Sequence, residues 1–160
     1  MEGKKPDEIQ AEIYEAFSEL AKSMGFSPIH GSIIGALIVG GGSLSLQEMS
    51  KRTGYSISMI SLSLDLLELL DIVKKVKKSR DRNLYIELKG DLLESLKKIF
   101  LMRVKKSIQA SLEKFEESRK KLEKTDGEKK DDVLRAVMLL EKEIKRLDKY
   151  VTLLSEMKLP

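Results

Sequence analysis

The chain has 160 residues, of which 41% are hydrophobic and 35% charged, and its formal net charge is +4 at neutral pH. This length fits one domain, or a small domain with a long helical extension, and the large charged share favours long solvated helices. The absence of cysteine excludes disulfides and thiolate metal sites. Since no apolar run reaches bilayer length and the acidic first residues do not resemble a signal peptide, we expect a cytoplasmic protein that does not bind membranes.

Two helices are predicted before residue 43. The first opens after Pro6-Asp7 and closes at Gly25, and its apolar stripe consists of Ile9, Ile13, Phe17, Leu20 and Met24. The second begins at Pro28, carries Ile33, Ile34, Leu37 and Ile38, and ends at the three glycines 40–42. These glycines lack the strand before them and the Lys-Ser/Thr pair after them that a phosphate-binding loop needs, so we interpret them as a linker.

Residues 44–88 hold the most informative pattern. Ser45 and Glu48 have the spacing of a capping box at the start of a short helix that ends at Thr53-Gly54. Ser56 offers a second N-cap, and apolar residues then recur at helical spacing at positions 60, 64, 67 and 70. Two β-rich segments, residues 72–78 and 84–88, flank a turn. This order predicts a winged helix-turn-helix, whose second helix lies in the DNA major groove while its hairpin follows the flanking backbone.

Positive charge is concentrated on the predicted wing. Residues 72–89 contain seven basic and two acidic side chains, a net charge of +5, whereas residues 1–24 carry a net charge of −3 and residues 25–71 a net charge of −2. A charge run alone usually marks a solvated face. Beside a helix-turn-helix it favours binding of double-stranded DNA.

The rest of the chain predicts a helical hairpin of residues 91–124 and 131–157, broken at residues 125–128. Its second helix carries a heptad stripe, made by Val133, Val137, Leu140, Ile144, Leu147, Val151 and Leu154. A strict heptad stripe requires a partner helix. Packing within the hairpin and dimerisation would each supply one, and we expect both, because a two-helix hairpin leaves an apolar face uncovered.

The sequence therefore predicts a mainly α fold with a small β-hairpin, a winged helix-turn-helix plus long dimerisation helices. We expect an N-terminal dimerisation helix in residues 1–25, a DNA-binding domain in residues 26–90, and a C-terminal hairpin for dimerisation in residues 91–160.

A family resemblance supports this organisation. Residues 54–75 (GYSISMISLSLDLLELLDIVKK) resemble the second helix-turn-helix helix of MarR-type transcriptional regulators, most closely in their GbsR-like branch. Residues 28–37 (PIHGSIIGAL) are similar to the proline-led helix of that branch, and residues 44–49 (LSLQEM) to its Leu-Ser-Leu-x-Glu-Ile motif. The resemblance covers about residues 26–90. It implies a DNA-binding regulator, and the branch implies control of genes for osmoprotectant uptake or synthesis.

Three positions depart from the family's pattern. Asp71 replaces the glycine after the recognition helix, although Asp also tolerates a left-handed backbone. Ser32 replaces a common arginine, which puts the contact of that arginine in doubt. Asp65 replaces a basic residue, and its carboxylate would repel phosphate if it faced DNA.

Candidate DNA-binding residues come from the second helix and the wing. On the helix they are short hydroxyl and apolar side chains that we expect to point outward, namely Ser56, Ile57, Ser58, Met59, Ser61 and Ser63. Because none is Arg, Asn or Gln, we expect moderate specificity aided by water, thymine methyl groups and DNA shape. Phosphate contacts are expected from Arg52, Lys74, Lys77 and neighbouring lysines, and minor-groove contacts from Arg80 and Arg82 at the wing tip. The alternatives are a small-residue packing face and a wing that contacts protein.

Catalysis is not expected. His30 is the only histidine and is interpreted as structural, so no Ser/His/Asp set and no cofactor or metal site is proposed. The predicted function is a sequence-specific transcriptional regulator that binds a pseudo-palindromic operator as a homodimer. The alternative is a winged-helix adaptor that binds protein and not DNA. A small-molecule effector near residues 28–39 also stays open, against constitutive or salt-sensitive binding, because few aromatic residues (Tyr14, Phe17, Phe26 and Tyr55) precede the wing.

Overall fold

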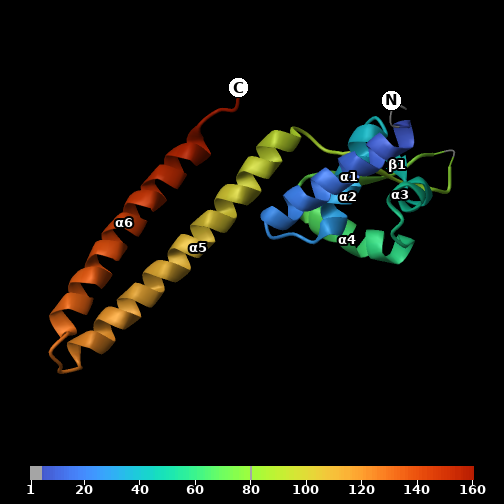
Figure 1. The fold of residues 1–160 in the computed structure, drawn as a ribbon. Coiled ribbons are helices and arrows are strands. Elements are labelled where there is room, and N and C mark those ends of the chain that lie inside the picture. The colour runs from blue at the N-terminus through green and yellow to red at the C-terminus, as the bar shows by residue number, and fades with distance from the viewer. Residues whose placement is uncertain (1–4, 80) are drawn as a thin grey trace. The chain divides into compact units, whose positions relative to one another are not determined.

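A computed structural model describes residues 5–79 and 81–160. Its helices are α1 (Pro6–Ser23), α2 (Pro28–Val39), α3 (Leu46–Thr53), α4 (Ile57–Leu69), α5 (Leu92–Glu123) and α6 (Lys130–Glu156), and its strands are β1 (Ser43–Ser45), β2 (Val73–Lys77) and β3 (Leu84–Leu88) (Figure 1). The chain divides into two compact units, Met1–Ser95 and Leu96–Pro160. The predicted mainly helical fold with a small β-hairpin is confirmed.

In the first unit, α1 packs closely on α2. Gly31 lies at the contact, where a Cβ atom would stand 2.0 Å from the carbonyl oxygen of Phe17. Beside it, the hydroxyls of Ser18 and Ser32 lie 2.7 Å apart and share a hydrogen bond. Ser32, which stands where the resembling family often has arginine, is therefore buried and joins two helices.

The sheet has three antiparallel strands in the order β1-β3-β2. Strands β2 and β3 form the predicted hairpin, with Lys75 opposite Ile86 and Lys77 opposite Leu84. Strand β1 adds a third strand on the other edge of β3, with Leu44 opposite Ile86. The sequence interpretation did not include β1, because three residues are too few to show an alternating pattern.

The core of this unit lies between the helices and the inner face of the sheet. Its fully buried side chains come from α2, α3, α4 and the sheet, namely Ile33, Leu37, Met49, Ile60, Leu64, Leu67, Val73 and Ile86. Alternation along the sheet therefore places one face on this core and leaves the other face more accessible.

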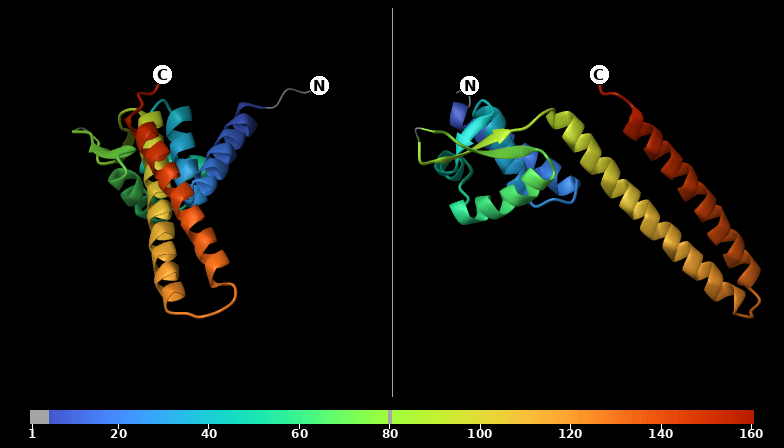
Figure 2. Two further views of the ribbon diagram at one scale, coloured as in Figure 1. Left: turned by 90° about the vertical axis from the view of Figure 1, so that its left-hand side faces the viewer. Right: turned by 180° about the vertical axis from the view of Figure 1, so that it is seen from behind.

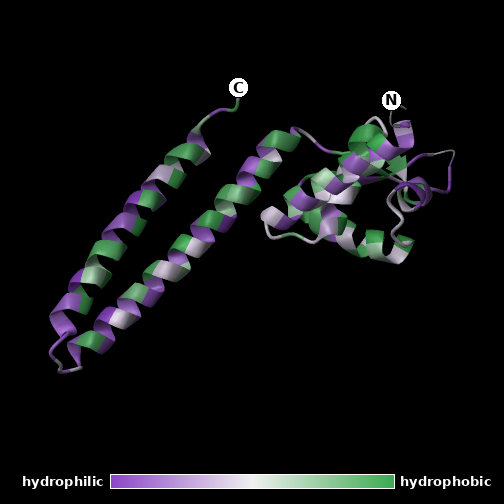
Figure 3. Ribbon diagram, in the orientation of Figure 1, coloured by the Kyte–Doolittle hydropathy of each residue, from purple (hydrophilic) through white to green (hydrophobic). Residues whose placement is uncertain are grey.

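In the second unit, residues 96–123 of α5 and helix α6 run antiparallel (Figures 1 and 2). Their shared core is small: Leu101, Ile108 and Val151 are buried, with Val104, Leu112, Ile144 and Leu154 packed around them. Near one end, the Lys97 ammonium donates a hydrogen bond to the carbonyl oxygen of Met157 at 2.6 Å. The predicted helical hairpin is present, and hydrophobic and hydrophilic residues alternate along both of its helices (Figure 3).

Within the described residues, no helix is both long enough and apolar enough to cross a bilayer.

Candidate nucleic-acid interface

The turn between α3 and α4 is built by local hydrogen bonds. At the start of α3, the Glu48 N–H donates to Ser45 Oγ at 3.2 Å and the Ser45 N–H donates to the Glu48 carboxylate at 2.9 Å, which is the predicted capping box. The hydrogen bonds that the Ser45 N–H and hydroxyl donate to the Glu48 carboxylate lower the pKa of Glu48. At its end, Gly54 adopts a left-handed backbone with φ of 77°, a conformation that glycine takes without a steric penalty. The chain can therefore turn sharply into α4.

Helix α4 starts at the predicted cap. Ser56 Oγ accepts the N–H of Met59 at 3.3 Å. Ile60, Leu64 and Leu67 are fully buried on its inner side, as expected from their spacing. Two residues after the helix ends at Leu69, Asp71 has a left-handed backbone with φ of 62°, so this aspartate takes the conformation that glycine would have supplied.

The side of α4 that faces solvent differs from the sequence expectation at one position. Ser56, Ile57, Ser58 and Met59 are exposed and Ser61 is half-buried, in line with the prediction. Ser63 is buried instead, and its hydroxyl donates to the Met59 carbonyl oxygen at 2.9 Å, so the expected outward position was wrong. Ser63 lies three residues after Ile60 and next to Leu64, which places it on the inner face.

Leu62 takes the outward position that the sequence interpretation had missed. Its side chain is 76% exposed. With residues 60, 64 and 67 inside, a repeat of 3.6 residues places Ser58, Leu62, Asp65 and Leu69 opposite them. A projection of the helix would have identified Leu62 as an outward position.

Several lysines of the wing are engaged by carboxylates. Lys74 pairs with Glu87 at 3.2 Å on the outer face of the sheet. Lys75, on the other face, pairs with Asp65 at 2.6 Å and with Glu68 at 3.2 Å, and its pKa is raised chiefly by the hydrogen bond to Asp65. Lys89 pairs with Asp71. The net positive charge of the wing is therefore partly neutralised near the base of the hairpin.

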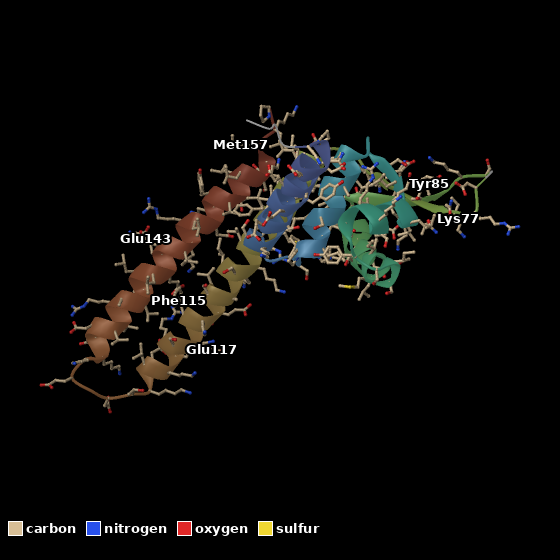
Figure 4. The ribbon with its side chains drawn as sticks, turned by 45° about the vertical axis from the view of Figure 1, so that its right-hand side comes forward. Lys77, Tyr85, Phe115, Glu117, Glu143 and Met157 are labelled. Carbon is tan, nitrogen blue, oxygen red and sulfur yellow. The ribbon has the colours of Figure 1, made fainter. Side chains whose placement is uncertain are left out.

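The cations toward the tip are more available. Lys77 and Arg82 are exposed and make no ion pair with any residue that the structure describes. Figure 4 labels Lys77 and Tyr85 on the hairpin. Arg80, the other residue predicted at the wing tip, lies outside the described residues. Arg52, on α3, is exposed as expected for a phosphate contact.

Local contacts order the turn of the wing. The Lys78 ammonium lies 4.0 Å from the centre of the Tyr85 ring, a cation–π contact. The Tyr85 hydroxyl donates to Asp81 at 2.7 Å, which lowers the pKa of Asp81 and raises that of Tyr85. Asp81 also accepts the N–H of Asn83 at 3.0 Å. These contacts tie Lys78, Asp81 and Asn83 to one another and to Tyr85 of β3.

The residues considered for an effector or for chemistry are packed in the first unit. The rings of Tyr14 and Phe17 lie beside Gly35 of α2. His30 is buried, forms a hydrogen bond with the Ser27 carbonyl oxygen at 3.2 Å, and packs edge-on against Phe26. Burial lowers the pKa of His30. Among the described residues, no three His, Cys, Asp or Glu side chains gather in a way that would hold a metal ion.

Comparisons with known proteins give a likeness of fold. No family model and no curated protein matches the chain. Among solved structures, it is similar to a crystal structure of a transcriptional regulator, with a TM-score of 0.58 and 14% identity over 90% of this chain and 93% of the other. The chain therefore shares the overall fold of that protein.

Two further similarities are weaker. One is to a mutant of Staphylococcus aureus MepR bound to an oligodeoxyribonucleotide, with a TM-score of 0.43 and 19% identity over 88% of this chain and 93% of the other. The other is to the YusO protein from Bacillus subtilis, with a TM-score of 0.43 and 18% identity over 89% of this chain and 99% of the other.

Proposed function

We propose that this protein is a sequence-specific DNA-binding transcriptional regulator that acts in the cytoplasm as a homodimer on a pseudo-palindromic operator. The observation that carries the proposal is the exposed N-terminal half of α4, capped by Ser56, in the same unit as a wing with available cations at Lys77 and Arg82. In winged helices the second helix reads base edges while basic groups on the hairpin contact phosphates. The fold likeness to a transcriptional regulator supports this role.

The second unit supports the homodimer. Helix α6 carries an apolar face that its hairpin partner does not cover, which we call the open face of α6; it consists of Leu139, Leu140, Leu147, Tyr150 and Leu153, each at least 41% exposed. Contiguous exposed apolar surface of this kind marks an interaction site. A second copy of the chain would cover it with an identical face, as two-fold symmetry requires.

Two-fold symmetry sets the form of the operator. Two copies of α4 would read the same half-site in opposite orientations, with the half-sites about one turn of DNA, roughly 34 Å, apart. The test is a gel-shift titration of the full chain with the DNA upstream of its own gene and with a scrambled duplex of equal length. We expect retention of the upstream DNA and a strong decrease in affinity with salt. Equal binding of both duplexes, or of neither, would contradict the proposal.

We also propose that the protein belongs to the GbsR-like branch, on the basis of the resemblance of residues 26–90. Membership of this branch would imply that the regulator binds a quaternary ammonium compound as its effector. A cage for such a cation needs several converging aromatic faces. Tyr14 and Phe17 already pack against Gly35, so a cage would have to form from these rings or displace them. Calorimetry with choline and betaine tests this assignment: heat, with a change in operator affinity, supports it. Absence of both leaves a regulator without that effector.

Two observations favour the alternative of a protein-binding adaptor. Lys74, Lys75 and Lys89 are already paired with carboxylates, and Leu69 at the end of α4 is 82% exposed. An adaptor would use this apolar end of α4 and would bind DNA without sequence preference, or not at all. The gel-shift comparison above separates the two functions.

A further inference from the structure

We propose that α4 selects its DNA by contact with thymine C5-methyl groups in the major groove, through Met59 and Leu62 with Ile57 at the flank. This inference rests on the proposed function, since it concerns how the same helix would discriminate among base pairs. It assigns a specificity-determining role to Leu62.

The exposed arc of α4 is largely hydrocarbon. Ile57, Met59 and Leu62 are 43%, 51% and 76% exposed, and they occupy the first half of the helix, the half that enters the groove in helix-turn-helix proteins. Met59 and Leu62 are three residues apart and therefore neighbours on the helix surface. Only the short Ser58 and Ser61 stand between them and Ile57, so a groove floor can approach these apolar groups closely.

Most of the hydroxyls on this arc already have partners. Ser56 accepts the Met59 N–H and shares a hydrogen bond with Ser58 at 3.0 Å. Ser63 does not belong to this arc, because it is buried on the inner face and donates to the Met59 carbonyl oxygen. Because each bond restricts where a hydroxyl can point, these serines offer less directional recognition of base edges than free side chains would.

The major groove has one apolar feature that distinguishes base pairs, the C5-methyl group of thymine. Guanine and adenine are usually identified by bidentate contacts from Arg, Lys, Asn or Gln, and residues 56–69 contain none of these. The chemistry of the exposed arc thus matches thymine methyls better than any hydrogen-bonding edge of a base.

The surrounding charges favour DNA over an apolar protein surface. Arg52 on α3 and Lys77 on the wing are both exposed, and both belong to the unit that carries α4. Farther along α4, Asp65 forms an ion pair with Lys75 at 2.6 Å. This pair offsets the negative charge of the carboxylate nearest to the exposed arc. Exposed cations in the same unit as a short apolar arc fit a groove floor bordered by phosphates.

The test compares thymine with uracil, which pairs identically but lacks the methyl group. Duplexes that bind the full chain are selected from a random-sequence library and then resynthesised with deoxyuridine in place of thymidine. Burial of one methyl group corresponds to about a fourfold change in affinity. One contacted methyl per half-site should therefore weaken binding of the uracil duplex by about sixteenfold for a symmetric dimer.

The variants assign the effect to α4. In Leu62→Ala, the ratio of thymine to uracil affinity should fall toward one, and Met59→Ala should lower it partially. Leu69→Ala is the matched control, because Leu69 is similarly exposed but lies at the far end of the helix. It should keep the wild-type ratio.

Each outcome has a separate meaning. Enrichment of no duplex overturns the proposed function and this inference together. Selected duplexes that bind equally well in both forms overturn the inference alone and leave the regulator intact. A uracil effect that is the same in wild type, Leu62→Ala and Leu69→Ala also overturns it, because the methyl groups would then act through DNA shape.

Discussion

The two units differ in how completely they bury their own apolar residues. In the first unit, α2, α3, α4 and the sheet enclose side chains such as Ile33, Leu64 and Ile86 completely. In the second, only Leu101, Ile108 and Val151 are buried, while large apolar side chains along α6 remain exposed. Since burial of apolar area is the main driving force of folding, the first unit has the core of an autonomous domain and the second has the surface of an incomplete one.

Because of this difference, substitutions in the two units should have different consequences. The first unit needs close internal packing, because its helices meet with little space between them. In the second unit the open face of α6 stays exposed in a single chain, and the proposed homodimer would cover it. Substitutions in the first unit should therefore act mainly on stability or on DNA contacts, and substitutions on the open face should act mainly on assembly.

The largest effect on stability is expected at the contact of α1 and α2. In Gly31→Ala, the new Cβ would stand 2.0 Å from the Phe17 carbonyl oxygen and 2.7 Å from the Ser18 Cα, both backbone atoms that cannot move aside alone. We expect a loss of about 3 kcal/mol or more in the free energy of unfolding, measured with urea. Without the clash, alanine inside a helix would stabilise by up to about 1 kcal/mol.

The control for this substitution is Gly127→Ala, where no atom lies within 4 Å of the added Cβ. It should change the free energy of unfolding by less than about 0.5 kcal/mol. A Gly31→Ala variant as stable as this control would show that α1 does not pack on α2 as described.

Assembly should respond to charges on the open face of α6. In Leu139→Glu/Tyr150→Glu, two side chains that are 60% and 59% exposed become carboxylates three turns apart on one face. A dimer that buries this face would then have to desolvate four carboxylates, so we expect dissociation to a monomer at micromolar concentration. Light scattering measures the mass, and circular dichroism verifies that the helices persist.

Met138→Glu is the matched control for assembly. Met138 is 55% exposed but lies on the other side of α6, in a groove with Arg119 and Lys142. This variant should keep the wild-type mass. If all three proteins are monomers, or if all are dimers, the open face of α6 is not the dimer contact.

Most of the fold was predictable from the sequence, because it depends on local patterns. The capping box at Ser45, the turn at Gly54 and the left-handed Asp71 follow from residue type and spacing alone. Strand β1 was not predictable, since its three residues become a strand only by pairing with β3, about forty residues later in the chain. Its existence depends on tertiary contacts, which override local propensity.

The candidate interface was predictable in outline but not in detail. Ser63 was expected to point outward and is buried, whereas Leu62, which was not among the expected outward positions, is exposed because helix geometry places it opposite the buried side. The ion pairs of Lys74 and Lys75 depend on strand register and on the packing of β2 beside α4, which composition does not contain. The formal charge of the wing therefore overstated the number of cations free to contact phosphate.

DNA binding should distinguish the available cations of the wing from the paired ones. Lys77→Ala and Arg82→Ala each remove an exposed cation without an ion pair among the described residues, whereas Lys74→Ala removes one that Glu87 already partly neutralises. For each lost phosphate contact per subunit, the slope of log affinity against log salt concentration should flatten by about one. Titrations at several salt concentrations measure this, and an equal change in Lys74→Ala would contradict the distinction.

The smallest effect is expected at the capping box of α3, and it depends on pH. Glu48 accepts two hydrogen bonds from Ser45, and its folded-state pKa is lowered by them, first by the backbone N–H. A carboxylate whose pKa is lower in the folded state stabilises the fold above its unfolded pKa and loses that contribution as the pH falls through its folded pKa. Glu48→Ala should cost about 0.5 to 1 kcal/mol at pH 7, and the difference from wild type should shrink below about pH 4.

Gln47→Ala, at an exposed neighbouring position, is the control and should show no such pH dependence. Urea unfolding of the three proteins at about pH 7 and about pH 3.5, on either side of the ordinary pKa of a glutamate, measures the effect. A constant deficit at both values would mean that the Glu48 charge does not contribute to the cap.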